Sequence, residues 1–191
     1  ESRGLGDVYK RQAKGLLMST IQEDNLVVFS EDKTLLGQKG NVPEEPYTIE
    51  IGKANVTREG DDLTIVAIGK MVAVAEETAE KLAEDQVSVE VIDLRSVSPW
   101  DKETVLDSVK KTGRLIVIDE SNPQCNIAGD VASVIGDVGF DYLDGPIKKV
   151  TAPDTPVPFA ANLEAAYMPN ADKVLDIIAS ELIDDLKKTN A

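Results

Sequence analysis

The sequence of 191 residues contains no histidine. Imidazole is the side chain that most often serves as a general acid or base near neutral pH, and it is a frequent metal ligand. Any mechanism that requires imidazole in one of these roles therefore cannot be completed within this chain.

Cysteine occurs only once, at Cys125. A single thiol excludes an internal disulfide and a cysteine-rich metal cluster, and it fits a protein of a reducing compartment. A thiol beside a helix start, as predicted here, can have a lowered pKa, although a simple buried thiol is the more ordinary interpretation. We therefore expect a cytoplasmic protein.

Long hydrophobic runs and basic residues are also few. No apolar run approaches the ~20 residues of a membrane span, and no secretory signal pattern occurs. Twenty basic residues face 35 acidic ones, which gives a net charge of −15. This charge repels nucleic acid phosphates and favours a basic partner surface, although solvated surface positions explain most of the carboxylates. We therefore expect neither nucleic acid nor a membrane as a partner.

The stretch VSVEVIDLRSVSPWD, residues 87–101, combines a β-branched strand pattern with a helix start. We predict that Ser98 caps this helix, that Pro99 occupies its first turn, and that Asp101 completes a capping box. Further strand patterns and helical patterns alternate with it, at 63–68, 71–84, 115–118, 126–138, 147–151 and 171–188. This order predicts an α/β fold with a mostly parallel sheet and helices on both faces.

The first third of the chain differs in pattern from the rest. Residues 1–12 lack periodicity and join abruptly to the helical pattern that begins at Ala13, which is typical of a non-native leader. Residues 13–36 combine a helical face with the strand-like run Leu26–Phe29, and we interpret them as the end of a truncated domain. Residues 37–62 are predicted to be a linker with an edge strand, and 63–191 a second domain.

Open α/β sheets place ligands outside the carboxyl ends of their strands. Polar residues follow three of the predicted strands, at Gly69–Lys70, Asp93–Arg95 and Asp119–Glu120. Gly69–Lys70 can form a phosphate-binding loop or an ordinary tight turn. Asp93 and Arg95 can contact an anion or form a structural ion pair. Asp119 and Glu120 can form a carboxylate pair in which one pKa is raised, or they can be two unrelated acids. Because no nucleophile or histidine lies nearby, we do not expect catalysis here.

The segment from Thr20 to Asn25 follows the first predicted helix. The last carbonyls of a helix lack intrahelical partners and carry partial negative charge. With the Glu23 carboxylate and a turn at Asn25, these oxygens can gather a hard cation, and an ordinary helix end is the alternative.

Five stretches occur in an order that resembles one family: AKGLLMSTIQEDNLVVFSEDK, YTIEIGKANVTREGDDLTIVAIGKMV, VSVEVIDLRSVSPWD, KKTGRLIVIDESNP and VTAPDTPVPFAANLEAAYMP. They are similar to the β subunit of the thiamine-diphosphate-dependent 2-oxoacid dehydrogenases of the pyruvate, acetoin and branched-chain types. The resemblance covers residues 13 to about 186. The stretch DESNPQC is most similar to the acetoin and pyruvate types.

The resemblance implies an α2β2 component that decarboxylates a 2-oxoacid on thiamine diphosphate with Mg and passes the acyl group to a lipoyl arm. Residues 13–36 would end a pyrimidine-binding domain, and 63–191 would form a transketolase-like C-terminal domain. The family's catalytic glutamate and histidine would lie upstream, so we assign no catalytic or cofactor-binding residue to this chain. The implied partners are the α subunit, a second β subunit and the subunit-binding domain of the acyltransferase.

Two sites carry over from the resemblance. The family's potassium site corresponds to Thr20, Ile21, Glu23 and Asn25, where Thr20 and Glu23 replace alanine and aspartate. The family's acyltransferase contact corresponds to Asp144, in the segment FDYLDGP. The alternatives are a fragment of another thiamine enzyme, such as transketolase or deoxyxylulose-phosphate synthase, and a non-catalytic interaction module.

Overall fold

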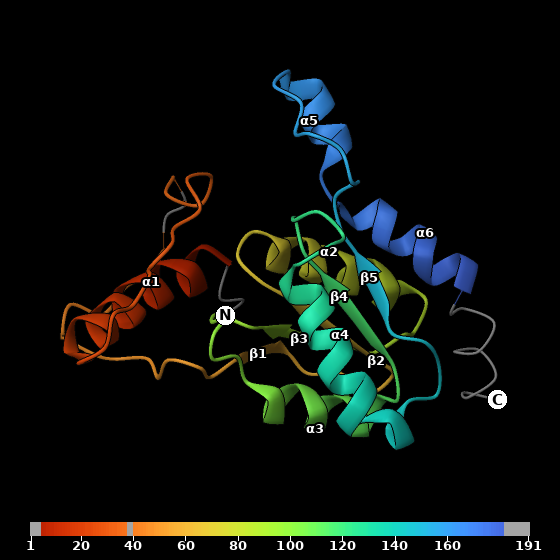
Figure 1. Cartoon of the computed structure of the whole chain (residues 1–191), viewed down its shortest axis with the longest axis horizontal. Coiled ribbons are helices and arrows are strands. Elements are labelled where there is room, and N and C mark those ends of the chain that lie inside the picture. Colours follow the sequence, from red (N-terminus) through yellow and green to blue (C-terminus); the bar gives the residue numbers. More distant parts are fainter. Residues whose placement is uncertain (1–4, 38–39, 182–191) are drawn as a thin grey trace.

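The computed structural model of the chain describes residues 5–37 and 40–181 (Figure 1). In chain order its elements are α1 (Leu5–Gln22), β1 (Asn55–Arg58), β2 (Leu63–Ala67), α2 (Met71–Glu84), β3 (Val89–Asp93), α3 (Lys102–Thr112), β4 (Leu115–Ile118), α4 (Ile127–Val138), the 3-10 helix η1 (Phe140–Tyr142), β5 (Lys148–Val150), α5 (Ala161–Tyr167) and α6 (Ala171–Glu181).

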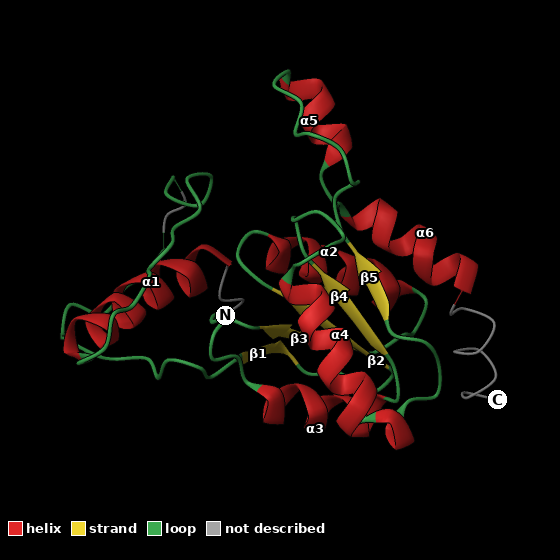
Figure 2. Cartoon of the chain, in the orientation of Figure 1, coloured by secondary structure: helices red, strands yellow, loops and turns green. Residues whose placement is uncertain are grey.

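The five strands form one sheet in the order β1-β3-β2-β4-β5. β2, β3, β4 and β5 run parallel, with Leu63 opposite Val89 and Ile65 opposite Ile116. β1 pairs antiparallel with β3 at the edge. Figure 2 shows the sheet between helical layers. The predicted α/β fold with a mostly parallel sheet is confirmed.

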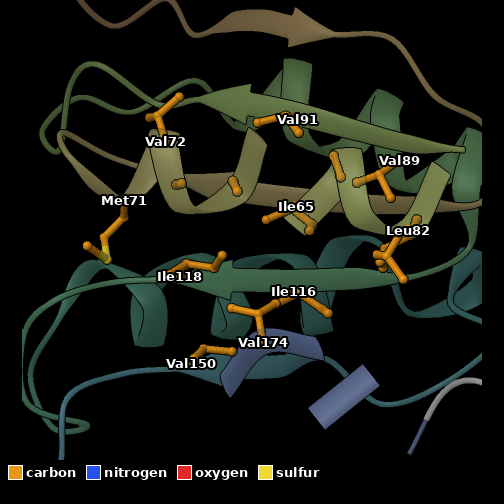
Figure 3. Packing of buried hydrophobic residues seen from close by; sticks show 14 of the residues in the cluster. Ile65, Met71, Val72, Leu82, Val89, Val91, Ile116, Ile118, Val150 and Val174 are labelled. Atoms are coloured by element: carbon orange, nitrogen blue, oxygen red, sulfur yellow. The ribbon is translucent and has the colours of Figure 1, made fainter. Parts of the chain in front are cut away.

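The strands at the centre of the sheet are buried on both faces, and each face has its own core. On one face Ile65, Val91 and Ile116 pack with residues of α2 and α6 (Figure 3). On the other face Val66 and Val117 pack with residues of α3 and α4. Burial on both faces explains why these strands are continuous apolar runs in the sequence.

The start of α3 differs from the prediction. Asp101, and not Ser98, is the N-cap: its carboxylate accepts hydrogen bonds from the backbone N–H of Thr104 at 3.2 Å and of Ala54 at 3.1 Å. The Ser98–Pro99 peptide bond is cis, and both residues precede the helix. Burial alone would raise the pKa of Asp101, but hydrogen bonds from Thr104 and Ala54 hold that pKa below its ordinary value.

The N-terminal part departs from its predicted pattern in two places. Residues 5–12, expected to lack regular structure, form the first turns of α1, and Tyr9 is buried. Leu26–Phe29, expected to be a strand, has no regular secondary structure, and Leu26 is 96% exposed. No described strand lies beside this run to accept its backbone hydrogen bonds, and an isolated strand is unstable. The non-native leader at residues 1–12 stays a prediction.

The segment after α1 packs along that helix. The Lys14 ammonium donates to the carbonyl oxygens of Pro43 and Glu44, at 2.5 and 3.0 Å. The backbone N–H of Ile49 donates to the carbonyl of Gly15 at 3.1 Å. Residues 43–49 therefore lie against α1, and the edge strand in the predicted linker is limited to β1.

The C-terminal part contains one helix that periodicity did not predict, α5, which projects from the body of the protein (Figure 1). The predicted last helix is confirmed as α6 up to Glu181, and its continuation to residue 188 lies outside the described residues. Among the described helices, none combines the length and hydropathy needed to cross a bilayer.

Candidate docking surface

Asp144 lies in the loop that joins η1 to β5, close to the C-terminal end of α3. Its backbone N–H donates to the carbonyl oxygen of Gly113 at 2.8 Å, and its side chain is exposed. This loop precedes β5, so it lies at the amino ends of the parallel strands. The predicted partner-binding residue is therefore at the edge of the sheet opposite to the one where α/β folds usually bind ligands.

Asp144 can lie this close to the end of α3 because residue 113 is a glycine. It adopts a left-handed conformation with φ +68°, which ends α3 as the sequence predicts. A Cβ atom at Gly113 would lie 2.2 Å from Asp144 Oδ2. Because Gly113 has no side chain, it can both end the helix in a left-handed conformation and leave room for the Asp144 carboxylate.

An apolar groove of about 460 Å³ adjoins Asp144. It is lined by residues of α4, η1 and the following loop, which are Gly136, Phe140, Leu143, Asp144, Gly145, Pro146 and Ile147. Phe140 is 71% exposed, and Val138 and Tyr142 beside it are also exposed. A large exposed aromatic side chain beside a groove is typical of a protein-binding surface.

Exposed carboxylates occur in the same segment as this apolar area. Asp137, Asp141 and Asp144 are all exposed. The neighbouring Lys110 is engaged by the Asp107 carboxylate at 2.8 Å and lies 5.7 Å from the centre of the Tyr142 ring. We call Val138, Phe140, Tyr142 and the three aspartates the acidic docking surface. Its charge and shape suit a basic partner with an apolar contact residue.

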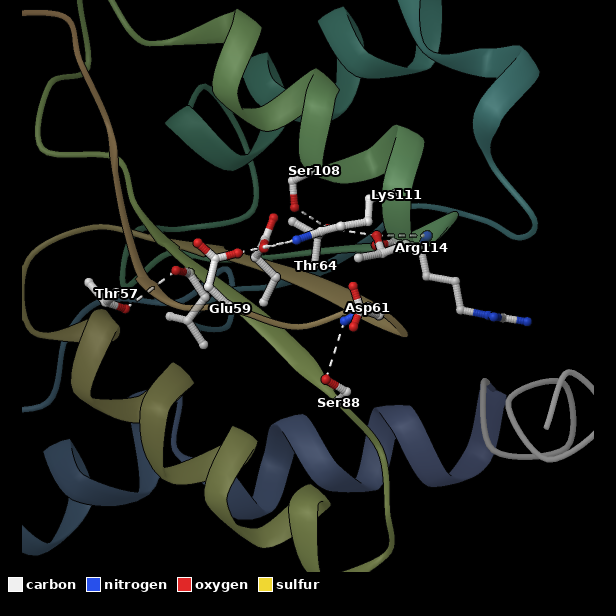
Figure 4. A network of polar contacts seen from close by, with 11 residues as sticks. Thr57, Glu59, Asp61, Thr64, Ser88, Ser108, Lys111 and Arg114 are labelled. Atoms are coloured by element: carbon white, nitrogen blue, oxygen red, sulfur yellow. Dashed lines mark hydrogen bonds and ion pairs between the residues drawn. The ribbon is translucent and has the colours of Figure 1, made fainter.

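A buried polar network holds α3, which carries Gly113, against the sheet (Figure 4). Glu90, near the start of β3, forms an ion pair with Lys111 of α3, and only 4% of the Glu90 side chain is exposed. Thr64 of β2 hydrogen-bonds Ser108 at 2.6 Å and Thr112 at 2.7 Å. Burial alone would raise the pKa of Glu90, but hydrogen bonds from Lys111 and Ser108 keep it below its ordinary value.

At the opposite edge of the sheet, the groups after β2 and β4 come together. Gly69 has φ +58° in the turn that starts α2, and Lys70 forms an ion pair with Glu120 at 2.6 Å. Asp119 is buried and accepts the backbone N–H of Ser121 at 2.9 Å. Asp119 and Glu120 therefore contact different partners. They do not form a carboxylate pair, which was one of the two interpretations of the sequence.

Asp93 and Arg95 follow β3 at the same edge. The Asp93 carboxylate is buried and accepts the backbone N–H of Arg95 at 3.2 Å and the Gln12 amide at 2.5 Å. Burial raises the pKa of Asp93. The contact is structural and uses the Arg95 backbone, not an ion pair with its guanidinium. Cys125, expected to be buried, is exposed.

The predicted cation segment lies at the exposed end of α1. The Thr20 hydroxyl donates to the carbonyl oxygen of Leu17 at 2.8 Å, and Ile21, Glu23 and Asn25 are exposed. The potassium site stays a prediction. Within the described part of the chain, no three His, Cys, Asp or Glu side chains are grouped to hold a metal ion.

The partner-binding role of Asp144, which the resemblance implied, stays a prediction, and the sequence reasoning did not single out the exposed aromatic residues near it. Phe140 and Tyr142 follow Gly139 directly after a helical pattern, in a chain with only 4% aromatic residues. The periodic apolar face of the helix stops before these two residues. Their position outside that face could have been used to predict that they are exposed.

Comparisons with known proteins agree with the fold. The sequence profile of the family described as "Transketolase, C-terminal domain" matches residues 52–174. The chain is 51% identical over 165 residues to "Acetoin:2,6-dichlorophenolindophenol oxidoreductase subunit beta" of Bacillus subtilis, covering 86% of the chain and 48% of that protein. It is 46% identical over 165 residues to "Pyruvate dehydrogenase E1 component subunit beta" of the same organism, covering 86% and 50%.

The chain thus spans about half the length of the curated relatives it matches. A solved structure described as "Split gene transketolase, inactive beta4 tetramer" is similar with a TM-score of 0.62 and 30% identity, over 76% of this chain and 47% of the other.

Proposed function

This chain belongs to the transketolase C-terminal domain family, and from that membership we propose that it is the C-terminal part of the β subunit of a thiamine-diphosphate-dependent 2-oxoacid dehydrogenase of the acetoin or pyruvate type. Its role is subunit assembly and docking to the acyltransferase core. The identity of 51% and 46% to β subunits of both types supports this proposal. The observation that carries the docking role is the acidic docking surface.

The docking partner is a basic module of the acyltransferase. The three exposed carboxylates attract basic side chains, and the exposed Phe140 offers an apolar contact in the same segment. Asp144 is held by its backbone bond to Gly113, so little conformational entropy is lost when a basic side chain binds its carboxylate.

Replacing Asp144 with alanine should weaken binding of the acyltransferase subunit-binding domain by ~1–3 kcal/mol, as for the loss of a hydrogen bond to a charged group. Isothermal titration calorimetry measures this change. The control is Glu84→Ala, because Glu84 is an equally exposed carboxylate at the end of α2. Equal affinities of the Asp144→Ala and Glu84→Ala proteins would remove Asp144 from the interface.

The decarboxylation chemistry belongs to parts of the complex outside this chain. Thiamine diphosphate with Mg would supply the electron sink for loss of CO2 when it is bound by the whole enzyme. The chain has no histidine to act as the acid or base of that reaction. Its own residues would shape the docking and assembly surfaces.

We therefore expect the isolated chain to release no CO2 from pyruvate above the rate of the cofactor alone. Assays with labelled pyruvate, thiamine diphosphate and Mg test this, and an intact α2β2 enzyme serves as the positive control. Turnover by the isolated chain would place catalytic residues within it.

Self-association and contact with an α subunit complete the proposal. The relative that is described as a beta4 tetramer supports pairing of two copies of this chain. The same relative favours a second candidate function, the C-terminal part of a transketolase. Its 30% identity is lower than the identity to the β subunits, so the dehydrogenase assignment is preferred.

A further inference from the structure

The loop between η1 and β5 contains Asp144 followed directly by Gly145, which is the only Asp-Gly pair in the sequence. The side-chain carboxyl of an aspartate can be attacked by the backbone nitrogen of the next residue, and the product is a cyclic imide, a succinimide. Glycine in the following position obstructs this attack least, because it has no Cβ atom. Whether the reaction takes place in a folded protein depends on whether both groups are free to approach each other.

Both reacting groups of this pair are free. The Asp144 side chain is exposed, and within the described part of the chain no donor reaches its carboxylate. The backbone N–H of Gly145 likewise has no acceptor among the described residues. Nothing lies within 4 Å of a Cβ atom built at Gly145, so neighbouring atoms do not obstruct ring closure. The carboxyl group can therefore turn toward a nitrogen that has no competing hydrogen bond.

The main chain is anchored on only one side of the reacting atoms. The N–H of Asp144 donates to the carbonyl oxygen of Gly113 at 2.8 Å, which fixes the backbone that leads into Asp144. Ring closure requires rotation about ψ of Asp144 and φ of Gly145, and both of these bonds follow the anchored N–H. Glycine accepts a wider range of φ than any other residue. The anchor therefore positions Asp144 without preventing the rotation that the reaction needs.

The other two carboxylates of the acidic docking surface lack this combination. Asp141 is exposed, but the N–H of the following Tyr142 donates to the carbonyl oxygen of Gly139 at 3.0 Å. Asp137 is also exposed, but the following residue is Val138, which is β-branched and belongs to α4. These two carboxylates face the same solvent and are less able to cyclise, so they provide internal references.

We propose that Asp144 and Gly145 form a self-modification site, at which the aspartate of the docking surface converts to isoaspartate. The Gly145 nitrogen bonds to Cγ of the protonated Asp144 side chain, and its proton leaves with the carboxyl hydroxyl as water. A second water molecule adds to the imide carbonyl carbon next to Cα, and the bond from that carbon to the nitrogen breaks as the nitrogen takes up a proton. One water molecule is released and one is consumed, so the reaction needs no other reactant.

The product should dock less well than the original chain. In isoaspartate the main chain runs through Cβ and Cγ and is longer by one carbon atom, while the free carboxylate is attached directly to Cα. The carboxylate therefore leaves its place beside Gly113, and the groove residues that follow, beginning with Pro146, are displaced. This consequence rests on the proposed docking role, whereas the modification itself does not.

Peptide mass spectrometry of the whole chain, incubated at neutral pH in water enriched in heavy oxygen, tests the modification. Each hydrolysis of the imide introduces one heavy oxygen atom, and isoaspartyl methyltransferase with S-adenosylmethionine methylates isoaspartate but not aspartate. Isoaspartate should form at residue 144 roughly tenfold faster than at Asp137 and Asp141, because only residue 144 is followed by a residue without Cβ. The Gly145→Ala chain, whose added Cβ atom meets no neighbour, should form severalfold less. Equal rates at the three aspartates, or an unchanged rate in Gly145→Ala, would overturn the modification site.

Calorimetric titration with the acyltransferase subunit-binding domain, before and after the incubation, tests the consequence for docking. The number of binding sites per chain should fall in proportion to the fraction of isoaspartate at residue 144, and it should fall less in Gly145→Ala over the same time. Isoaspartate without a loss of binding sites would overturn this consequence. A fresh chain that does not bind would instead contradict the proposed docking role, and the mass spectra would still decide the modification.

Discussion

Replacing Lys111 with methionine is expected to lower the free energy of unfolding by roughly 2–4 kcal/mol at pH 7, because the substitution leaves a buried carboxylate without its cation. Glu90 is only 4% exposed at its side chain and receives hydrogen bonds from Lys111 and Ser108. Methionine keeps most of the aliphatic length of lysine, so lost packing contributes little. Urea denaturation followed by the fluorescence of Trp100 measures the change.

The effect should depend on pH with a defined sign. The pKa of Glu90 in the folded protein is below its ordinary value of 4.5, so the carboxylate stabilises the wild type above about pH 4.5, and this contribution is lost as the pH falls through the folded-state pKa. Without Lys111, burial should instead raise the pKa of Glu90. The difference between the two proteins should therefore be largest near neutral pH and shrink below about pH 4.5.

Lys110→Met is the matched control. Lys110 is the neighbouring lysine on α3, and it pairs with Asp107, whose side chain is 72% exposed. An exposed ion pair contributes little to stability, so this variant should remain close to the wild type. Similar losses in the two variants would mean that the buried position of Glu90 is not the cause.

Gly60→Ala is expected to lower the free energy of unfolding by at least ~3 kcal/mol, at or beyond the upper end of overpacking effects. Gly60 lies in the turn between β1 and β2, where a Cβ atom would approach the carbonyl carbon of Val89 to 2.2 Å and the nitrogen of Glu90 to 2.4 Å. Backbone atoms of a central strand cannot move aside as a flexible side chain can. The turn itself is held to the same strand, since the N–H of Asp62 donates to the carbonyl of Ser88 at 2.8 Å.

Gly145→Ala provides the comparison for this prediction. Nothing lies within 4 Å of a Cβ atom built at Gly145, and its φ is not positive. This variant should stay within about 0.5 kcal/mol of the wild type, as do most surface substitutions. Thermal denaturation followed by circular dichroism distinguishes the two, and a Gly60→Ala protein as stable as Gly145→Ala would show that the β1–β2 turn can move away from β3.

Most strands and helices from residue 63 onward could be predicted from the sequence because their signals are local, and α5 is the exception. Continuous β-branched runs gave β2, β3 and β4, and the 3.6-residue period gave α2 with its bounds, Met71–Glu84. Gly113 ends α3 with φ +68°, in the left-handed conformation that glycine commonly adopts after a helix. The same local reasoning was wrong at Ser98, because a carboxylate three residues later accepts the helix N–H groups.

Leu26–Phe29 shows why a local pattern is not sufficient for a strand. The run has the composition of a buried strand, but the described residues supply no neighbouring strand, so it has no regular structure. A strand requires hydrogen-bond partners that are distant in sequence, whereas a helix contains its own.

What the sequence determined by itself is therefore the class of fold, the order of its elements and the absence of imidazole chemistry, because periodicity, turn residues and composition are properties of short segments. Only the tertiary structure decided that Asp144 lies beside Gly113, that Lys111 neutralises Glu90, and that Phe159 is held away from the core. Each of these facts is a distance between residues that the chain topology brings together or keeps apart, and no local pattern encodes that distance.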